Sequence, residues 1–90
     1  MDKSTKLMLK TNIKNLKDNK NILENTLKQV ELLLTIQRNS IKQYQDKGMS
    51  DEMIENEIDT INVIQEAYSQ VSFTVDALED AIAHLETIKK

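Results

Sequence analysis

The chain has 90 residues, one glycine, no proline, no cysteine and a formal net charge of −3. A single domain of this size buries little apolar area, and without cysteine neither a disulfide nor a thiolate metal site can stabilise it, so oligomerisation is the expected source of further stability. The longest apolar runs, such as that at 32–34, are far shorter than the roughly 20 residues that cross a bilayer, which excludes a membrane-spanning helix.

The first residues of the chain predict a cytoplasmic protein. Lys3, Lys6 and Lys10 interrupt this segment, and the apolar run at 7–9 is too short to be the continuous apolar core of a secretory signal. A protein exported by a leaderless route would also lack a secretory signal. The richness in Asn, Lys and Ile is typical of AT-rich genomes, such as those of low-GC bacteria and their phages.

A long first helix is predicted over about residues 3–46. In a heptad written abcdefg, apolar residues recur at a and d from Leu9 to Tyr44, interrupted only by Lys20 and Gln37. This phase predicts one helix with a coiled-coil seam. Position a holds Ile13, Lys20, Leu27, Leu34 and Ile41, and position d holds Leu9, Leu16, Leu23, Val30, Gln37 and Tyr44.

The weak place in this helix is 17–21, where Asn and Asp lower the helix propensity and Asp18 could cap a new helix. A break there would give a three-helix chain. We favour one continuous helix, because the apolar phase passes through unshifted and neither glycine nor proline interrupts it.

A turn is predicted at 47–50. Gly48, the only glycine, can adopt the left-handed conformation that closes a helix, and the Ser50 hydroxyl can cap the next one. Acidic residues at 51 and 52 suit the first turn of a helix. Met49 and Ile54 have the spacing of a hydrophobic staple.

A second helix is predicted over about residues 51–89. Position a holds Ile54, Ile61, Tyr68, Val75 and Ile82, and position d holds Glu57, Ile64, Val71, Leu78 and Leu85. The two helices have similar lengths, so the sequence predicts an all-α fold: a long antiparallel helical hairpin, coiled-coil-like, that forms a single helical domain over residues 1–90. The short turn sets a register in which Leu34 faces Ile64, Val30 faces Tyr68 and Leu27 faces Val71.

Charge is divided unequally between the two predicted helices. Residues 1–47 contain ten Lys/Arg and five Asp/Glu, a net charge of +5, and residues 48–90 contain two and ten, a net charge of −8. The register brings Lys17 near Glu79 and Lys10 near Glu86. We therefore expect the lysines of the first helix to form a solvated or internally paired face. Nucleic-acid binding through them is the weaker alternative, because no arginine or aromatic residue stands beside them.

Apolar residues that the seam does not use gather on one side of the hairpin, mainly at c and g. The predicted interaction residues are Ile22, Leu32, Leu33, Ile36, Val63, Ala67, Phe73 and Ala77. One explanation is a homodimer, in which two hairpins form a four-helix bundle. The other is a different partner protein that this side binds.

The sequence offers no pattern typical of catalysis or of metal or cofactor binding. His84 is the only histidine, and Asp80 four residues earlier does not complete a metal site with it. No nucleophile with a base partner and no glycine-rich phosphate loop is present. We expect a protein that is not an enzyme and holds neither a cofactor nor a metal.

The size and predicted shape resemble the small helical hairpins exported by type VII secretion. Their Trp-x-Gly motif is absent here, since the turn reads Asp46-Lys47-Gly48-Met49-Ser50. The leading prediction is a non-catalytic interaction module, such as a small regulator, adaptor or inhibitor. The alternative is a structural assembly or secretion component that works as a homo- or hetero-oligomer.

Overall fold

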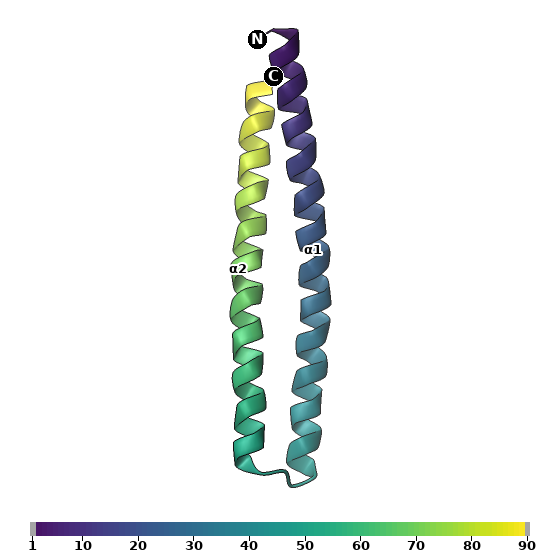
Figure 1. Cartoon of the computed structure of the whole chain (residues 1–90), viewed down its shortest axis with the longest axis vertical. Helices are drawn as coiled ribbons and strands as arrows, with labels where there is room; N and C mark the ends of the chain where they lie inside the picture. The colour runs from purple at the N-terminus through teal and green to yellow at the C-terminus, as the bar shows by residue number, and fades with distance from the viewer. Residues whose placement is uncertain (1, 90) are drawn as a thin grey trace.

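The chain folds into two long helices that lie side by side as an antiparallel hairpin (Figure 1). The computed structural model describes residues 2–89: helix α1 spans Lys3–Asp46 and helix α2 spans Asp51–Lys89, and no strand occurs in this range. The rod measures 69 × 15 × 14 Å. The predicted all-α helical hairpin is thereby confirmed. Neither helix, over the residues described, has an apolar stretch long enough to cross a membrane.

Helix α1 runs without interruption through 17–21, so the three-helix alternative is wrong. Asp18 does not cap a new helix; its carboxylate accepts a hydrogen bond from Lys14 at 3.0 Å, one turn earlier. Lys20 pairs in the same way with Glu24 at 3.1 Å. Ion pairs at this spacing stabilise a helix by a few tenths of a kcal/mol each. This is similar to the helix-propensity cost of an Asn or Asp residue.

The turn at 47–50, which we call the hinge, has the hydrogen bonds of a Schellman motif. Gly48 has φ +72°, the Met49 N–H donates to the Tyr44 carbonyl and the Gly48 N–H donates to the Gln45 carbonyl, both at 3.1 Å. These bonds satisfy carbonyl groups that the last turn of α1 would otherwise leave unpaired. Met49 and Tyr44 also pack against the core at this end of the rod, the apolar contact that accompanies the motif.

Each helix begins at a side-chain cap. The Ser50 hydroxyl accepts a hydrogen bond from the Met53 N–H at 3.3 Å, as the turn sequence predicts. Asp2 caps α1, with its carboxylate 2.7 Å from the Thr5 backbone nitrogen. The hydrogen bonds from Thr5 lower the pKa of Asp2 below its ordinary value, because they stabilise the charged form.

The core is a single seam between the helices. Every residue predicted at a and d is buried or half-buried, including the polar residues Lys20, Gln37 and Glu57. The buried side chains are Ile13, Leu34, Ile41, Ile54, Ile61, Val75 and Ile82. Among the described residues the least exposed of these, Ile13, still exposes 4% of its surface. One seam therefore forms a thin core.

The register of the seam agrees with the sequence prediction. Leu34 and Ile61 belong to one buried cluster, against which Val30 and Ile64 pack. Farther from the hinge, Leu27, Val30, Tyr68 and Val71 line a common groove. The hairpin thus keeps its predicted alignment over the half of the rod nearest the hinge.

The predicted ion pairs between the helices have the wrong partners. Lys17 does not pair with Glu79; its ammonium lies 2.6 Å from Glu86, the residue expected beside Lys10, while Glu79 pairs with Lys20 at 3.2 Å. Side chains on a helix lean toward its N-terminus, so Lys17 and Glu86 lean toward each other along the antiparallel rod, whereas Lys17 and Glu79 lean apart.

Candidate protein-binding face

The e positions of both helices line one side of the seam, and this side is polar. The Lys17–Glu86 ion pair joins two e positions, and Arg38 Nη2 donates to Gln65 Oε1 at 3.4 Å between two others. Lys20 reaches Glu79 on the same side. These contacts cover that flank of the seam with groups that are paired within the hairpin.

Lys20 is the one charged residue of the seam in the half of α1 nearest the chain termini. Its ammonium bonds Glu24 at 3.1 Å and Glu79 at 3.2 Å. The hydrogen bond to Glu24, and to a smaller extent the one to Glu79, raises the pKa of Lys20 above its ordinary value. Lys20 thus stays charged at neutral pH. It links α1 to α2 because its ammonium pairs with Glu24 on its own helix and with Glu79 on the other.

The g and c positions lie on the opposite side of the seam, and none of them within the two helices from Met8 to Ile88 carries a formal charge. This holds in a chain in which 30% of the residues are charged. We call this side the uncharged face. Its residues on α1 are Met8, Asn12, Asn15, Asn19, Ile22, Thr26, Gln29, Leu33, Ile36, Ser40 and Gln43, and on α2 Met53, Asn56, Thr60, Val63, Ala67, Gln70, Thr74, Ala77, Ala81, His84 and Ile88.

The uncharged face is in solvent in the single hairpin. All of its residues are exposed except Ser40, which is half-buried. A surface helix face normally collects charged side chains, so an exposed face without them is typical of a surface that another molecule covers.

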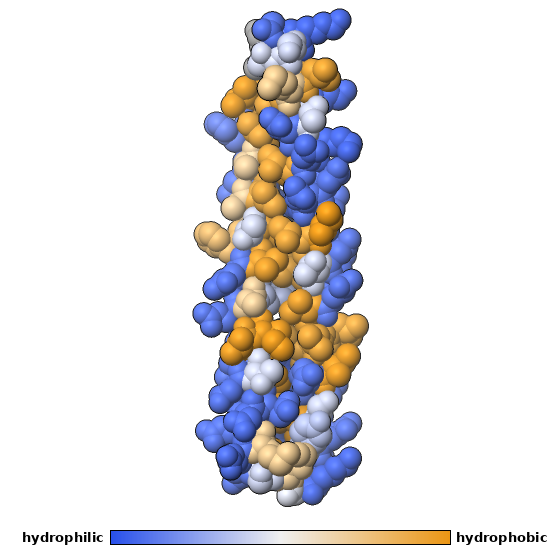
Figure 2. All heavy atoms as spheres, in the orientation of Figure 1, coloured by the Kyte–Doolittle hydropathy of each residue, from blue (hydrophilic) through white to orange (hydrophobic). Residues whose placement is uncertain are grey.

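Six of the eight predicted interaction residues belong to the uncharged face. Positions c and g hold Ile22, Leu33, Ile36, Val63, Ala67 and Ala77, and all six are exposed. Figure 2 views this face: apolar side chains follow the seam and widen over both helices, most broadly in the half nearest the hinge. Hydrophilic side chains lie along much of the two outer edges of the view and also cross the face near the hinge.

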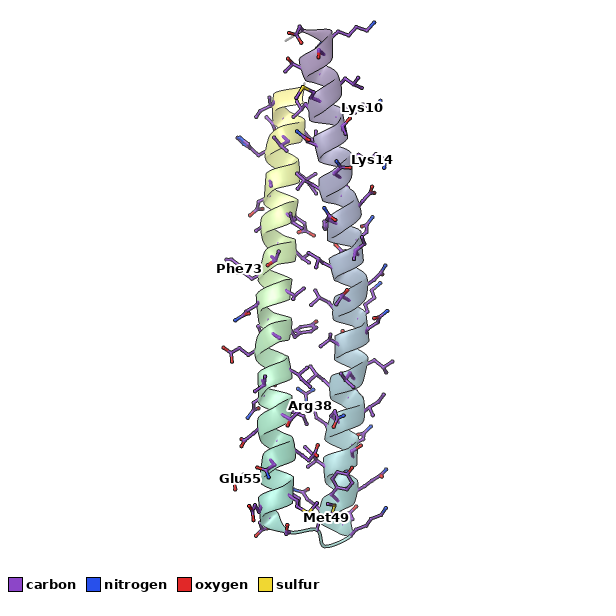
Figure 3. The ribbon with its side chains drawn as sticks, viewed as in Figure 1. Lys10, Lys14, Arg38, Met49, Glu55 and Phe73 are labelled. Atoms are coloured by element: carbon purple, nitrogen blue, oxygen red, sulfur yellow. The ribbon has the colours of Figure 1, made fainter. Side chains whose placement is uncertain are left out.

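The other two predicted residues, Leu32 and Phe73, occupy f positions at the outer edges of the uncharged face. Phe73 exposes 75% of its surface and projects from α2 away from α1 (Figure 3). Leu32 is also exposed. The register therefore groups six of the predicted residues on one surface and leaves these two at its margins.

A shallow groove of about 220 Å³ lies in the uncharged face between the helices. Thr26, Val63 and Ala67 form part of its wall above the seam residues. Its lining is apolar apart from one threonine and one tyrosine hydroxyl, which suits an aliphatic side chain better than a charged one.

Hydropathy alone does not select the small and amide residues of the face, such as Thr26, Gln29, Gln70 and Thr74. The signal that finds them is the absence of charge at every c and g position once the heptad is aligned. Aliphatic, small and amide side chains in this arrangement can pack and hydrogen-bond against another helix.

Some lysines of α1 form ion pairs within the hairpin. Lys14, Lys17 and Lys20 each form an ion pair with a carboxylate of the hairpin. Among the residues described, no three His, Cys, Asp or Glu side chains lie close enough together to hold a metal ion.

Comparison of the chain with protein-family models, with curated protein sequences and with solved structures gives no match.

Proposed function

We propose that the chain is a non-catalytic protein-interaction module that binds another polypeptide chain through the uncharged face. The observation that carries this proposal is the uneven distribution of charge around the hairpin. Ion pairs and charged residues line the e side and the outer edges, while the c and g positions of both helices have no charge. A small regulator, adaptor or inhibitor acts through such a surface.

The exposed aliphatic residues of the face support the same proposal. Ile22, Leu33, Ile36 and Val63 are large and each at least 42% exposed, and they lie on one surface rather than scattered over the rod. Single exposed aliphatic residues need no explanation, whereas a contiguous apolar surface on a small protein is typical of a binding site.

Site-specific photocrosslinking in the native host tests this function. The photoreactive residue p-benzoylphenylalanine replaces Ile36 on the uncharged face, and in the matched control it replaces Lys28, at an exposed b position of the same helix. We expect covalent products with a protein from position 36 and none from position 28. Equal products from both positions, or none from position 36, would refute the proposal.

A further inference from the structure

We propose that the chain covering the uncharged face is a second copy of this protein, packed face to face and antiparallel, with the two hinges at opposite ends and the twofold axis at Gln29 and Gln70. This inference rests on the proposed function and names its partner. The product is a four-helix bundle with one isologous interface.

A second copy supplies the buried area that one hairpin lacks. The buried side chains form a single row along the seam, and the face that would widen this core is in solvent. From Asn12 to Gln43 the face is about 45 Å long at 1.5 Å per residue. With a rod width of 15 Å, its flat area is about 700 Å², close to the roughly 800 Å² per partner of a stable interface.

The charge distribution permits this contact. In an antiparallel face-to-face dimer, α1 lies against α1 of the second copy and α2 against α2, so helices of like net charge meet. Every Lys and Arg within α1 occupies a, b or e, and none lies at c or g. The two basic helices can therefore pack without placing like charges in the interface.

The polarity of α1 is symmetric about Gln29. Ile22 and Ile36 lie seven residues to either side, and Asn15 and Gln43 fourteen residues to either side. Rotation about an axis at Gln29 thus places aliphatic on aliphatic and amide on amide.

The polarity of α2 has the same symmetry about Gln70. Val63 and Ala77 lie seven residues away, and the polar Asn56 and His84 lie fourteen residues away. Because Leu27 faces Val71 and Val30 faces Tyr68 in the register, Gln70 is level with Gln29 to within about one residue. One axis therefore serves both helices, and the two glutamines of each copy can hydrogen-bond across it.

Side-chain volume decides between antiparallel and parallel packing. On the hinge side of the glutamines the face carries Leu33 and Val63, and at matching distances on the other side it carries Thr26 and Ala77. Antiparallel packing sets Leu33 against Thr26 and Val63 against Ala77, so these two large residues each meet a small one. Parallel packing sets α1 against α2 of the second copy, which brings the large residues Leu33, Ile36 and Val63 together near the hinge.

The first measurement is the molar mass in solution at about 10 μM, by sedimentation equilibrium, with helicity followed by circular dichroism. We expect twice the chain mass of 10.4 kDa for the wild type. Leu33→Glu should raise the dissociation constant roughly 100-fold or more, because it buries an unpaired charge twice in a symmetric interface. The matched control, Thr35→Glu, adds the same charge at a b position and should leave the dimer intact.

The second measurement fixes the orientation and does not depend on whether Leu33→Glu folds. Since the chain has no cysteine, Lys47→Cys carries a single spin label per copy at the hinge. The antiparallel dimer predicts about 55 Å between the two labels, and a parallel dimer predicts about 25 Å or less.

Each outcome decides the proposal. A well-folded wild-type monomer, a short hinge-to-hinge distance, or a dimer that Thr35→Glu dissociates and Leu33→Glu does not would overturn it. A monomer that still gives products with another protein from position 36 would refute the second copy and leave the proposed function standing.

Discussion

At the residue scale, Gly48 is the position whose backbone most restricts substitution. Its φ of +72° lies in the left-handed region, and nothing lies within 4 Å of where a Cβ would be. The requirement for glycine is thus conformational and not steric against neighbours. The hinge depends on it because the Schellman bonds from Gly48 and Met49 form only in this conformation.

Gly48→Ala should lower the free energy of unfolding by about 1 kcal/mol, the cost of placing a β-carbon in the left-handed region. Gly48→Asn is the matched control and should cost less, because asparagine tolerates this conformation. Urea denaturation of the three proteins at one protein concentration measures the difference. Equal stability of the alanine variant and the wild type would show that the hinge adopts another turn.

At the scale of the elements, the helices are aligned by the apolar seam and by two ion pairs between the helices, Lys17–Glu86 and Lys20–Glu79. Lys17 and Glu86 are each about half exposed, so their attraction is screened and adds only about 0–1 kcal/mol. The same pair still acts against a shifted register, because a shift by one heptad would separate its members by about 10 Å.

Charge reversal tests this pairing. Lys17→Glu should lower the free energy of unfolding by up to about 1 kcal/mol, since it sets two carboxylates together, and adding Glu86→Lys should restore most of the loss. Lys14→Glu is the control, because Lys14 pairs only with Asp18 on its own helix and Glu86→Lys should not rescue it. A double variant no more stable than Lys17→Glu alone would contradict the pairing.

At the scale of the whole molecule, the proposed dimer predicts that stability depends on whether the uncharged face is covered. Ile61 exposes 6% of its surface and lies in the seam, whereas Val63, two residues later, exposes 68%. Substitutions at Ile61 and Val63 therefore test the core of one hairpin and the proposed interface between copies, respectively.

Ile61→Ala should destabilise the protein by about 2 kcal/mol or more at every protein concentration, because it removes packing inside the hairpin. Val63→Ala should raise stability by a few tenths of a kcal/mol at high dilution, through helix propensity alone. At concentrations where the dimer forms, the same change should instead lower stability by about 1 kcal/mol, through lost burial. Thermal unfolding over a range of concentrations measures both; a Val63→Ala effect with one sign throughout would argue against the dimer.

The sequence by itself determined the hairpin. A heptad phase that survives through 17–21, one glycine at 48 and a capping serine at 50 leave few alternatives, because helix periodicity and turn chemistry are local properties of the chain. The register followed too, since a four-residue connection allows little slippage.

Only the tertiary structure decided which charges pair and which surface is left uncovered. Lys17 pairs with Glu86 and not Glu79, because the outcome depends on how two side chains lean across an antiparallel seam, which residue spacing does not contain. The heptad already predicts surplus apolar residues at c and g, and the packed hairpin shows that every residue of the uncharged face except Ser40 is exposed. Its small and amide residues are unremarkable one at a time, and their shared lack of charge has physical meaning only on a surface that two helices form together.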